Sequence, residues 1–116
     1  MGTELRRFPR IPYDDEGHIE FRGADAFPVT IRTVSCQGAG VDVDAKLAPR
    51  IKPGAEIQLV LHVDDHDINL PGRIVWAAGS HVGIRLRLGL ATSATRQAYA
   101  SWIVPLTNKA ITRARR

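Results

Sequence analysis

The chain has 116 residues, the size of one domain, and its 44% hydrophobic and 24% charged composition argues against disorder and against separate catalytic and regulatory lobes. No run approaches the roughly 18 apolar residues of a membrane span, and the N-terminal stretch lacks the apolar region of a signal peptide. The one cysteine, Cys36, excludes an internal disulfide and a cysteine-rich zinc site. We therefore expect a small soluble domain, cytoplasmic and without membrane insertion.

The charge balance points to a class of partner. The formal net charge is +4, from 16 basic and 12 acidic residues, and the basic side is almost entirely arginine. Arginine presents a planar fork that suits phosphates and guanine edges, and it stacks on aromatic rings. The surplus hints at a phosphate or nucleotide partner, although composition alone favours a generic basic surface, so the positions of the arginines must decide.

Six segments alternate between apolar and polar residues, with the period of two that is typical of strands with one buried face. In the first of them, Ile19 and Phe21 share one side while His18, Glu20 and Arg22 share the other. The six segments are 17–22, 27–33, 38–44, 56–63, 68–76 and 81–88. Short strands at this spacing, with no helix between them, predict an antiparallel barrel or sandwich.

Turn residues mark the connections between these strands. Pro53 and Gly54 form a turn signal before the fourth strand, and the polar cluster 64–67 predicts a hairpin loop after it. Pro71 and Gly72 lie inside the fifth strand, which predicts an edge strand or a bulge at that point.

A single helix is predicted after the last strand. Thr92 or Ser93 can cap it, 94–104 holds good helix formers, and Pro105 predicts its end. One face of this helix carries Thr95, Tyr99, Trp102, Ile103 and Leu106. The predicted divisions are an N-terminal arm over 1–16, a barrel over 17–90, the helix over 91–106 and a flexible basic tail over 107–116.

Residue types that often carry catalysis or bind metals lack suitable partners in the sequence. His62 and His66 flank carboxylates, but they straddle a predicted hairpin and no helix holds them on one face, so a charged loop is preferred to a zinc site. His18 and His81 are expected on solvated strand faces. No pattern assembles an acid, a base and a nucleophile, so we expect neither an enzyme nor a bound metal or cofactor.

Two segments do carry residues suited to an anionic ligand. Arg6, Arg7 and Arg10 precede the first strand on a segment that prolines keep extended, so Arg6 and Arg10 share one side of it. After the second strand, Ser35 can hydrogen-bond a phosphate or a ring edge, and Gly38 lets the backbone turn tightly so that its N–H groups face a ligand.

In this order, the two segments resemble the PilZ domain family. The family signature is RxxxR followed by [D/N]xSxxG, at the start of a six-stranded antiparallel barrel with a C-terminal helix. Arg6-x-x-x-Arg10 matches the first motif, and x-x-Ser35-x-x-Gly38 matches the second. The resemblance covers roughly residues 4 to 104.

The closing strands agree with this resemblance. Gly72-Arg73-Ile74-Val75-Trp76 followed by Val82-Gly83-Ile84-Arg85-Leu86 is similar to the end of a PilZ barrel. The resemblance therefore implies a mainly all-β fold: a six-stranded antiparallel β-barrel of PilZ type, preceded by an arm that carries RxxxR and followed by one C-terminal α-helix.

The resemblance also implies a ligand, the bacterial second messenger cyclic di-GMP. By position, Arg6 and Arg10 match the family's two ligand arginines, Ser35 its serine and Gly38 its glycine, while Arg7 is a further candidate for phosphate contact. A guanidinium can stack on guanine while its N–H groups reach a phosphate. The expected function is binding of cyclic di-GMP and relay by conformational change to an unidentified effector protein or a domain of a parent protein.

One position departs from the family pattern. Thr33 stands where the family usually has Asp or Asn, and its hydroxyl offers a guanine edge one weaker acceptor, at a cost on the order of 1–3 kcal/mol. This departure keeps open a degenerate PilZ module that binds a protein and no nucleotide. A small basic barrel that binds single-stranded nucleic acid is a further alternative, against which counts the small number of aromatic residues outside predicted core and helix positions.

Overall fold

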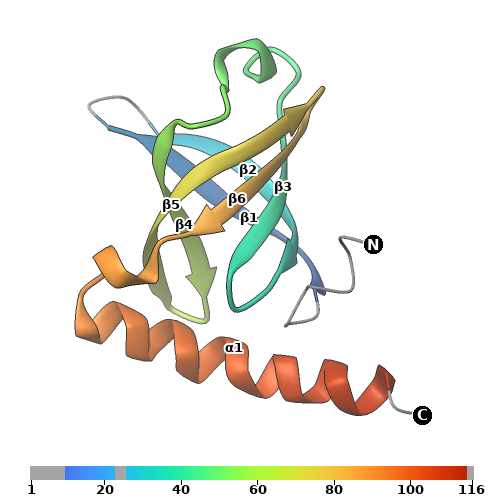
Figure 1. Cartoon of the computed structure of the whole chain (residues 1–116), viewed down its shortest axis with the longest axis vertical. Helices are drawn as coiled ribbons and strands as arrows, with labels where there is room; N and C mark the ends of the chain where they lie inside the picture. The colour runs from blue at the N-terminus through green and yellow to red at the C-terminus, as the bar shows by residue number, and fades with distance from the viewer. Residues whose placement is uncertain (1–9, 23–25, 115–116) are drawn as a thin grey trace.

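Six strands and one helix make up the fold. The computed structural model describes residues 10–22 and 26–114. The strands are β1 (Ile11–Phe21), β2 (Ala26–Val34), β3 (Gly38–Val43), β4 (Glu56–Val63), β5 (His66–Ala78) and β6 (His81–Leu86). All neighbouring strands pair antiparallel, in the closed order β1-β2-β3-β6-β5-β4 (Figure 1). The predicted six-stranded antiparallel barrel is confirmed.

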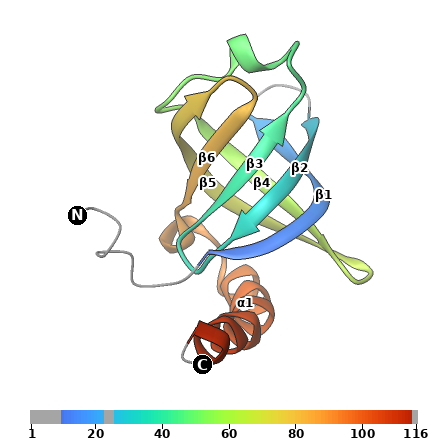
Figure 2. The same cartoon turned by 90° about the vertical axis from the view of Figure 1, so that its right-hand side faces the viewer.

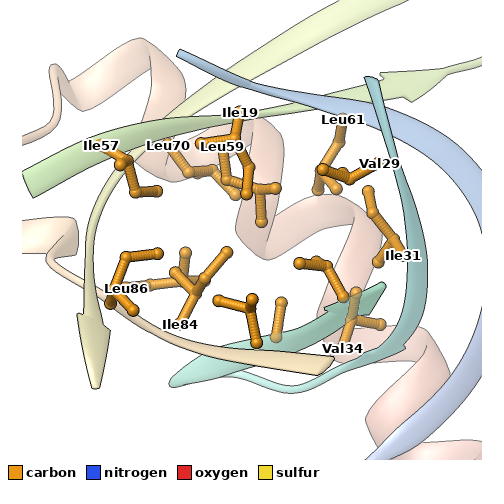
Figure 3. Close-up of a cluster of buried hydrophobic side chains, with 14 of the residues drawn as sticks. Ile19, Val29, Ile31, Val34, Ile57, Leu59, Leu61, Leu70, Ile84 and Leu86 are labelled. Atoms are coloured by element: carbon orange, nitrogen blue, oxygen red, sulfur yellow. The ribbon is translucent and has the colours of Figure 1, made fainter. Parts of the chain in front are cut away.

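The interior of the barrel is filled by the apolar side of each alternating strand. Figure 3 shows these side chains pointing inward from opposite walls, with Ile31 facing across from Leu70 and Ile84. Ile31, Leu59, Leu61, Leu70, Ile74 and Val82 are fully buried. Because branched aliphatic side chains recur at every second position, closing the sheet on itself buries them together and leaves the polar faces outside.

The helix α1 (Ser93–Ala114) lies across one end of the barrel, opposite the short 3₁₀ segment η2 (Ala48–Arg50) (Figures 1 and 2). A second 3₁₀ segment, η3 (Leu88–Leu90), leads into it. The predicted cap is present, since Thr92 Oγ1 accepts a hydrogen bond from the Thr95 backbone N–H at 3.1 Å. Within the described part of the chain, no helix is long and apolar enough to cross a membrane.

The predicted end of the helix at residue 106 is wrong, because residues 107–114, which were assigned to the tail, are helical. Pro105 lies inside α1, which continues to Ala114. A proline ring removes one helical hydrogen bond, but packing of the next turn against the barrel keeps the helix going. Thr107 is buried, and its hydroxyl donates to the Ile103 carbonyl at 2.8 Å, so the buried face of the helix continues past the exposed proline.

Two strand boundaries also differ from prediction. β1 begins at Ile11, six residues before the predicted start of the barrel at residue 17. Pro12 does not prevent this, because the chain pairs from Ile11 and passes through an irregular register between Pro12 and Asp15. β5 extends from His66 to Ala78, so the predicted loop over 64–67 narrows to a two-residue turn.

Candidate functional site

A pocket of about 210 Å³ opens on the barrel wall where the β2–β3 loop meets β5 and β6. Its lining contains four of the six residues predicted to bind the ligand, Arg10, Thr33, Ser35 and Gly38. The other lining residues are Gln37, Ala39, Val75, Trp76, Gly83, Ile84 and Arg85. Arg6 and Arg7, the two remaining predicted residues, lie outside the described residues. The fold thus brings one arginine of the first motif to the serine and glycine of the second.

Ser35 shapes the β2–β3 loop with its hydroxyl. Its Oγ accepts hydrogen bonds from the backbone N–H groups of Gln37 and Gly38, both at 3.1 Å, and its own N–H donates to the Gly38 carbonyl at 2.8 Å. This is the local side-chain-to-backbone bonding that stabilises tight turns. The prediction gave Ser35 a role in ligand contact; in the structure, its first role is to fix the loop backbone.

The structure requires glycine at position 38 for a different reason from the predicted one. Its backbone does not adopt the positive φ that a tight turn would require, since the glycines with positive φ in the described chain are Gly54 and Gly79. Instead, Gly38 begins β3 and pairs with Arg85, where an added Cβ would lie only 2.5 Å from the Ile84 carbonyl oxygen. The glycine is needed because two backbones approach closely there.

Thr33 reaches the pocket because of a bulge in β2. The β2–β3 register shifts between Ile31 and Thr33, so Val34 and not Thr33 follows Ile31 into the barrel interior. A methyl group added at Gly40 would lie 2.9 Å from Thr33 Oγ1 and 3.8 Å from Arg10 Nη1. Gly40 therefore leaves room for the side chains of both Thr33 and Arg10 beside the pocket.

Trp76 is a pocket residue that the sequence did not reveal. The β5–β6 register shifts between Ile74 and Trp76, which turns Val75 and Trp76 outward together, with exposed fractions of 46% and 40%. The indole lies directly over Gly83, where an added Cβ would come within 2.1 Å of Trp76 Nε1. Simple alternation places Trp76 in the core with Ile74; only the glycine on the facing strand hinted that a ring needs space there.

Arg85 and Gln37 complete the polar side of the pocket. Arg85 is exposed on β6 and pairs in register with Gly38, and Gln37 is exposed in the loop. The described lining holds two arginines and no carboxylate. An exposed aromatic face and two cationic side chains are chemically suited to an anion that also carries a ring. The N–H groups of Ser35, Gln37 and Gly38 donate within the loop, so these three do not face a ligand as the sequence predicted.

The β2–β3 loop is also attached to the helix. Tyr99 of α1 donates its hydroxyl to the Ser35 carbonyl at 2.5 Å, and Cys36 Sγ lies 3.6 Å from Thr107 Oγ1 (Figure 1 shows the loop above α1). Tyr99 is almost completely buried, and this burial raises the pKa of its hydroxyl, so it remains a neutral donor. The loop that lines the pocket is therefore held from inside by Ser35 and from below by the helix.

A charged cluster borders the pocket on its other side. Asp42 accepts hydrogen bonds from Arg32 Nε at 2.6 Å and from the His81 ring, and Arg32 also contacts Asp14. The Arg32 guanidinium holds the pKa of Asp42 below its usual value. Arg32 is thereby paired with two carboxylates. In the described part of the chain, no cluster of three or more His, Cys, Asp or Glu residues is arranged to hold a metal ion.

Comparison with known families decides the classification. A family model described as the PilZ domain matches residues 4–103, which is most of the chain. The chain belongs to the PilZ domain family. This confirms the resemblance inferred from the two motifs. No curated protein matches the PilZ chain significantly.

Solved structures share the fold of this PilZ domain at low sequence identity. The PilZ domain of CeSA from a cellulose-synthesizing bacterium is 15% identical, with a TM-score of 0.68 over 84% of this chain and 97% of that chain. The PilZ domain of YcgR from Escherichia coli, solved with c-di-GMP, is 11% identical, with a TM-score of 0.67 over 97% of this chain and 98% of that chain. At these identities, the similarity establishes the fold.

Proposed function

We propose that this PilZ domain is a receptor for cyclic di-GMP and that the pocket between the β2–β3 loop and Trp76 holds the ligand. The observation that carries the proposal is the convergence of Arg10, Thr33, Ser35 and Gly38, which the motifs single out, with Trp76 and Arg85 on one pocket. The YcgR PilZ domain solved with c-di-GMP supports the choice of ligand.

The pocket residues divide the recognition between them. Arg10 and Arg85 supply guanidinium groups for phosphate or for the O6 and N7 edge of guanine. The exposed indole of Trp76 provides a face on which a guanine stacks. The Ser35 hydroxyl accepts two hydrogen bonds of 3.1 Å and donates a longer one, of 3.4 Å, to the Gly38 carbonyl. A phosphate oxygen could replace that carbonyl as the acceptor of its proton.

Arg6 and Arg7 belong to the same proposal through the RxxxR motif. Arg6 is the partner of Arg10 in that motif, and Arg7 is the further candidate for phosphate contact. Each guanidinium adds a charge-assisted hydrogen bond to an anion, so we expect the affinity to depend on Arg6 and Arg10 together.

In this proposal, the receptor acts by changing its interaction with a partner and does not catalyse a reaction. Among the described residues of the pocket, none pairs a nucleophile with a base. We propose a non-enzymatic cytoplasmic receptor that needs no cofactor and acts on an effector protein or on another domain. A ligand can drive such a relay only through different affinities for two conformations. Tyr99 and Thr107 connect the loop to α1 and provide one route by which a change in the loop reaches the helix.

A degenerate module that binds a protein and no nucleotide is the second candidate. It is favoured by Thr33, which replaces the usual carboxylate or amide and offers only a hydroxyl beside Arg10.

Binding of single-stranded nucleic acid is the third candidate. The exposed Trp76 gives it one stacking face, although such binding depends on several faces in succession.

Calorimetric titration with cyclic di-GMP, GMP and a short oligonucleotide separates the three functions. We expect saturable binding of cyclic di-GMP that is tighter than that of GMP, and a loss of at least about tenfold, or about 1.4 kcal/mol, in Arg10→Ala and in Arg6→Ala. Arg50→Ala is the matched control, because Arg50 lies on η2 at the other end of the barrel and should keep the affinity. Absence of cyclic di-GMP binding in the parent protein would favour the degenerate module, and preference for the oligonucleotide would favour the nucleic-acid barrel.

A further inference from the structure

Two histidines from different strands meet on the outer wall of the barrel, away from the pocket. His18 lies on β1 and His62 on β4, the two strands whose pairing closes the barrel. His18 Nδ1 lies 2.9 Å from His62 Nε2, and the rings stand edge to face, with centroids 5.0 Å apart and an interplanar angle of 83°. The sequence predicted a solvated surface histidine at position 18; the structure gives it an imidazole partner 44 residues away.

A carboxylate holds the second imidazole from behind. Asp67 on β5 places Oδ1 2.6 Å from His62 Nδ1. An N–H donated to that carboxylate puts the proton of the neutral ring on Nδ1 and leaves the lone pair on Nε2, facing His18. Metal-binding histidines are oriented and made more basic by a carboxylate on the opposite nitrogen in the same way.

We propose that His18 and His62 form a two-imidazole site for a late first-row divalent cation, with Cu²⁺ bound more tightly than Zn²⁺. Imidazole nitrogen suits both cations, and their order follows the general affinity series. Two nitrogens at bonds of about 2.0 Å and a right angle, as in square-planar Cu²⁺, lie about 2.8 Å apart, close to the 2.9 Å observed. Tetrahedral Zn²⁺ separates them by about 3.3 Å, so it requires a wider displacement of the rings.

The cation replaces the proton in the hydrogen bond between the two rings. The proton that His18 carried on Nδ1 is then carried on its Nε2, so two neutral rings bind the cation without releasing a proton. Each ring turns about its Cβ–Cγ bond to direct a nitrogen lone pair at the metal. Since the described chain offers no third protein ligand in a cluster, water fills the remaining positions. The side chain of His62 is 39% exposed, which leaves the cation a path from solvent.

Occupancy of this site should stabilise the fold. A cation held by β1 and β4 crosslinks the seam where the first strand of the chain closes the barrel. A ligand that binds the folded state more tightly than the unfolded chain raises the free energy of unfolding, and this gain grows with the logarithm of the ligand concentration. The same site makes no use of Arg10 or Trp76, so it is independent of the proposed nucleotide function.

Titration of the tag-free protein with Cu²⁺ and Zn²⁺ tests the site. We expect one equivalent of Cu²⁺ to bind, with nitrogen couplings in its electron paramagnetic resonance spectrum and a rise in melting temperature. His18→Gln and His62→Gln should each weaken Cu²⁺ affinity by at least tenfold, and Asp67→Asn, which removes the partner on the far nitrogen, by about tenfold.

His66→Gln and His81→Gln are the matched controls, because these exposed histidines lie outside the pair and should leave Cu²⁺ affinity unchanged. Far-ultraviolet circular dichroism of each variant without metal shows that it is folded. The proposal is overturned if the parent protein shows no saturable binding at one equivalent. It is also overturned if folded His62→Gln keeps its affinity, or if His66→Gln loses it to the same degree, which would place the cation on the β4–β5 turn.

Discussion

Two hairpins of the same barrel connect neighbouring antiparallel strands in different ways. The β2–β3 loop, which lines the pocket, is fixed by the Ser35 hydroxyl, by the Tyr99 hydroxyl and by the close approach of Gly38 to β6. The β4–β5 hairpin closes with Asp64 and Asp65 in a two-residue turn between the paired residues Val63 and His66. Asp64 adopts a φ of 53°, a conformation that aspartate tolerates at modest cost.

The difference separates a connection that only reverses the chain from one that presents backbone to a pocket. A two-residue turn needs suitable backbone angles and nothing else. A loop that must keep one backbone conformation beside a pocket needs support from outside itself, since ordering it on ligand binding would cost conformational entropy. The β2–β3 loop has that support, so substitutions there should cost far more than substitutions in the β4–β5 turn.

Gly38→Ala should give the largest effect. The added Cβ meets the Ile84 carbonyl at 2.5 Å, and because the obstacle is backbone, β3 and β6 must separate. We expect a loss of about 2–3 kcal/mol in the free energy of unfolding, measured by urea denaturation. Gly89→Ala is the control, because an added Cβ there meets nothing within 4 Å. Equal stability of the two variants would mean that the β3–β6 contact is looser than described.

Tyr99→Phe should have an intermediate effect. It removes one hydroxyl and leaves the Ser35 carbonyl without its donor from α1, at an expected cost of about 1–2 kcal/mol in unfolding free energy. Tyr13→Phe makes the same chemical change where the hydroxyl is half-buried and its contact with the His62 carbonyl is long, at 3.5 Å, so it should cost clearly less. If both variants lose the same stability, the attachment of the loop to the helix has no special weight.

Asp64→Gly should have the smallest effect. Glycine relieves the strain of a positive φ but gives the unfolded chain more freedom, and these contributions oppose each other. We expect the unfolding free energy to stay within about 0.5 kcal/mol of the parent value. A loss comparable to that of Gly38→Ala would show that the β4–β5 turn also depends on tertiary support.

The sequence was sufficient for the barrel because period-two alternation survives in most of each strand. Alternation alone does not locate the β-bulges that interrupt it. The bulges before Thr33 and Trp76 each add one residue, which reverses the side of the sheet on which the following residues lie. Thr33 was still predicted, since a motif marks its position, whereas alternation alone places Trp76 on the same side of the strand as Ile74, inside the barrel.

The helix shows the same limit for tertiary contacts. Pro105 ends a helix by local rules, but Thr107 and its contact with Cys36 come from the packing of α1 on the barrel. The pairing of His18 with His62 likewise depends on which strands become neighbours when the sheet closes. No local pattern in the sequence carries that information.

Nuclear magnetic resonance titration with cyclic di-GMP tests the central claim most directly, because each hairpin reports separately. The account predicts the largest shifts for the backbone amides of Gln37 and Gly38 and for the Trp76 indole N–H, with the amides of Asp64 and Asp65 nearly unchanged. Arg10→Ala should require at least about ten times more ligand for the same shifts. Shifts centred on Asp64 and Asp65, or saturable shifts that leave Gln37, Gly38 and Trp76 in place, would contradict the account.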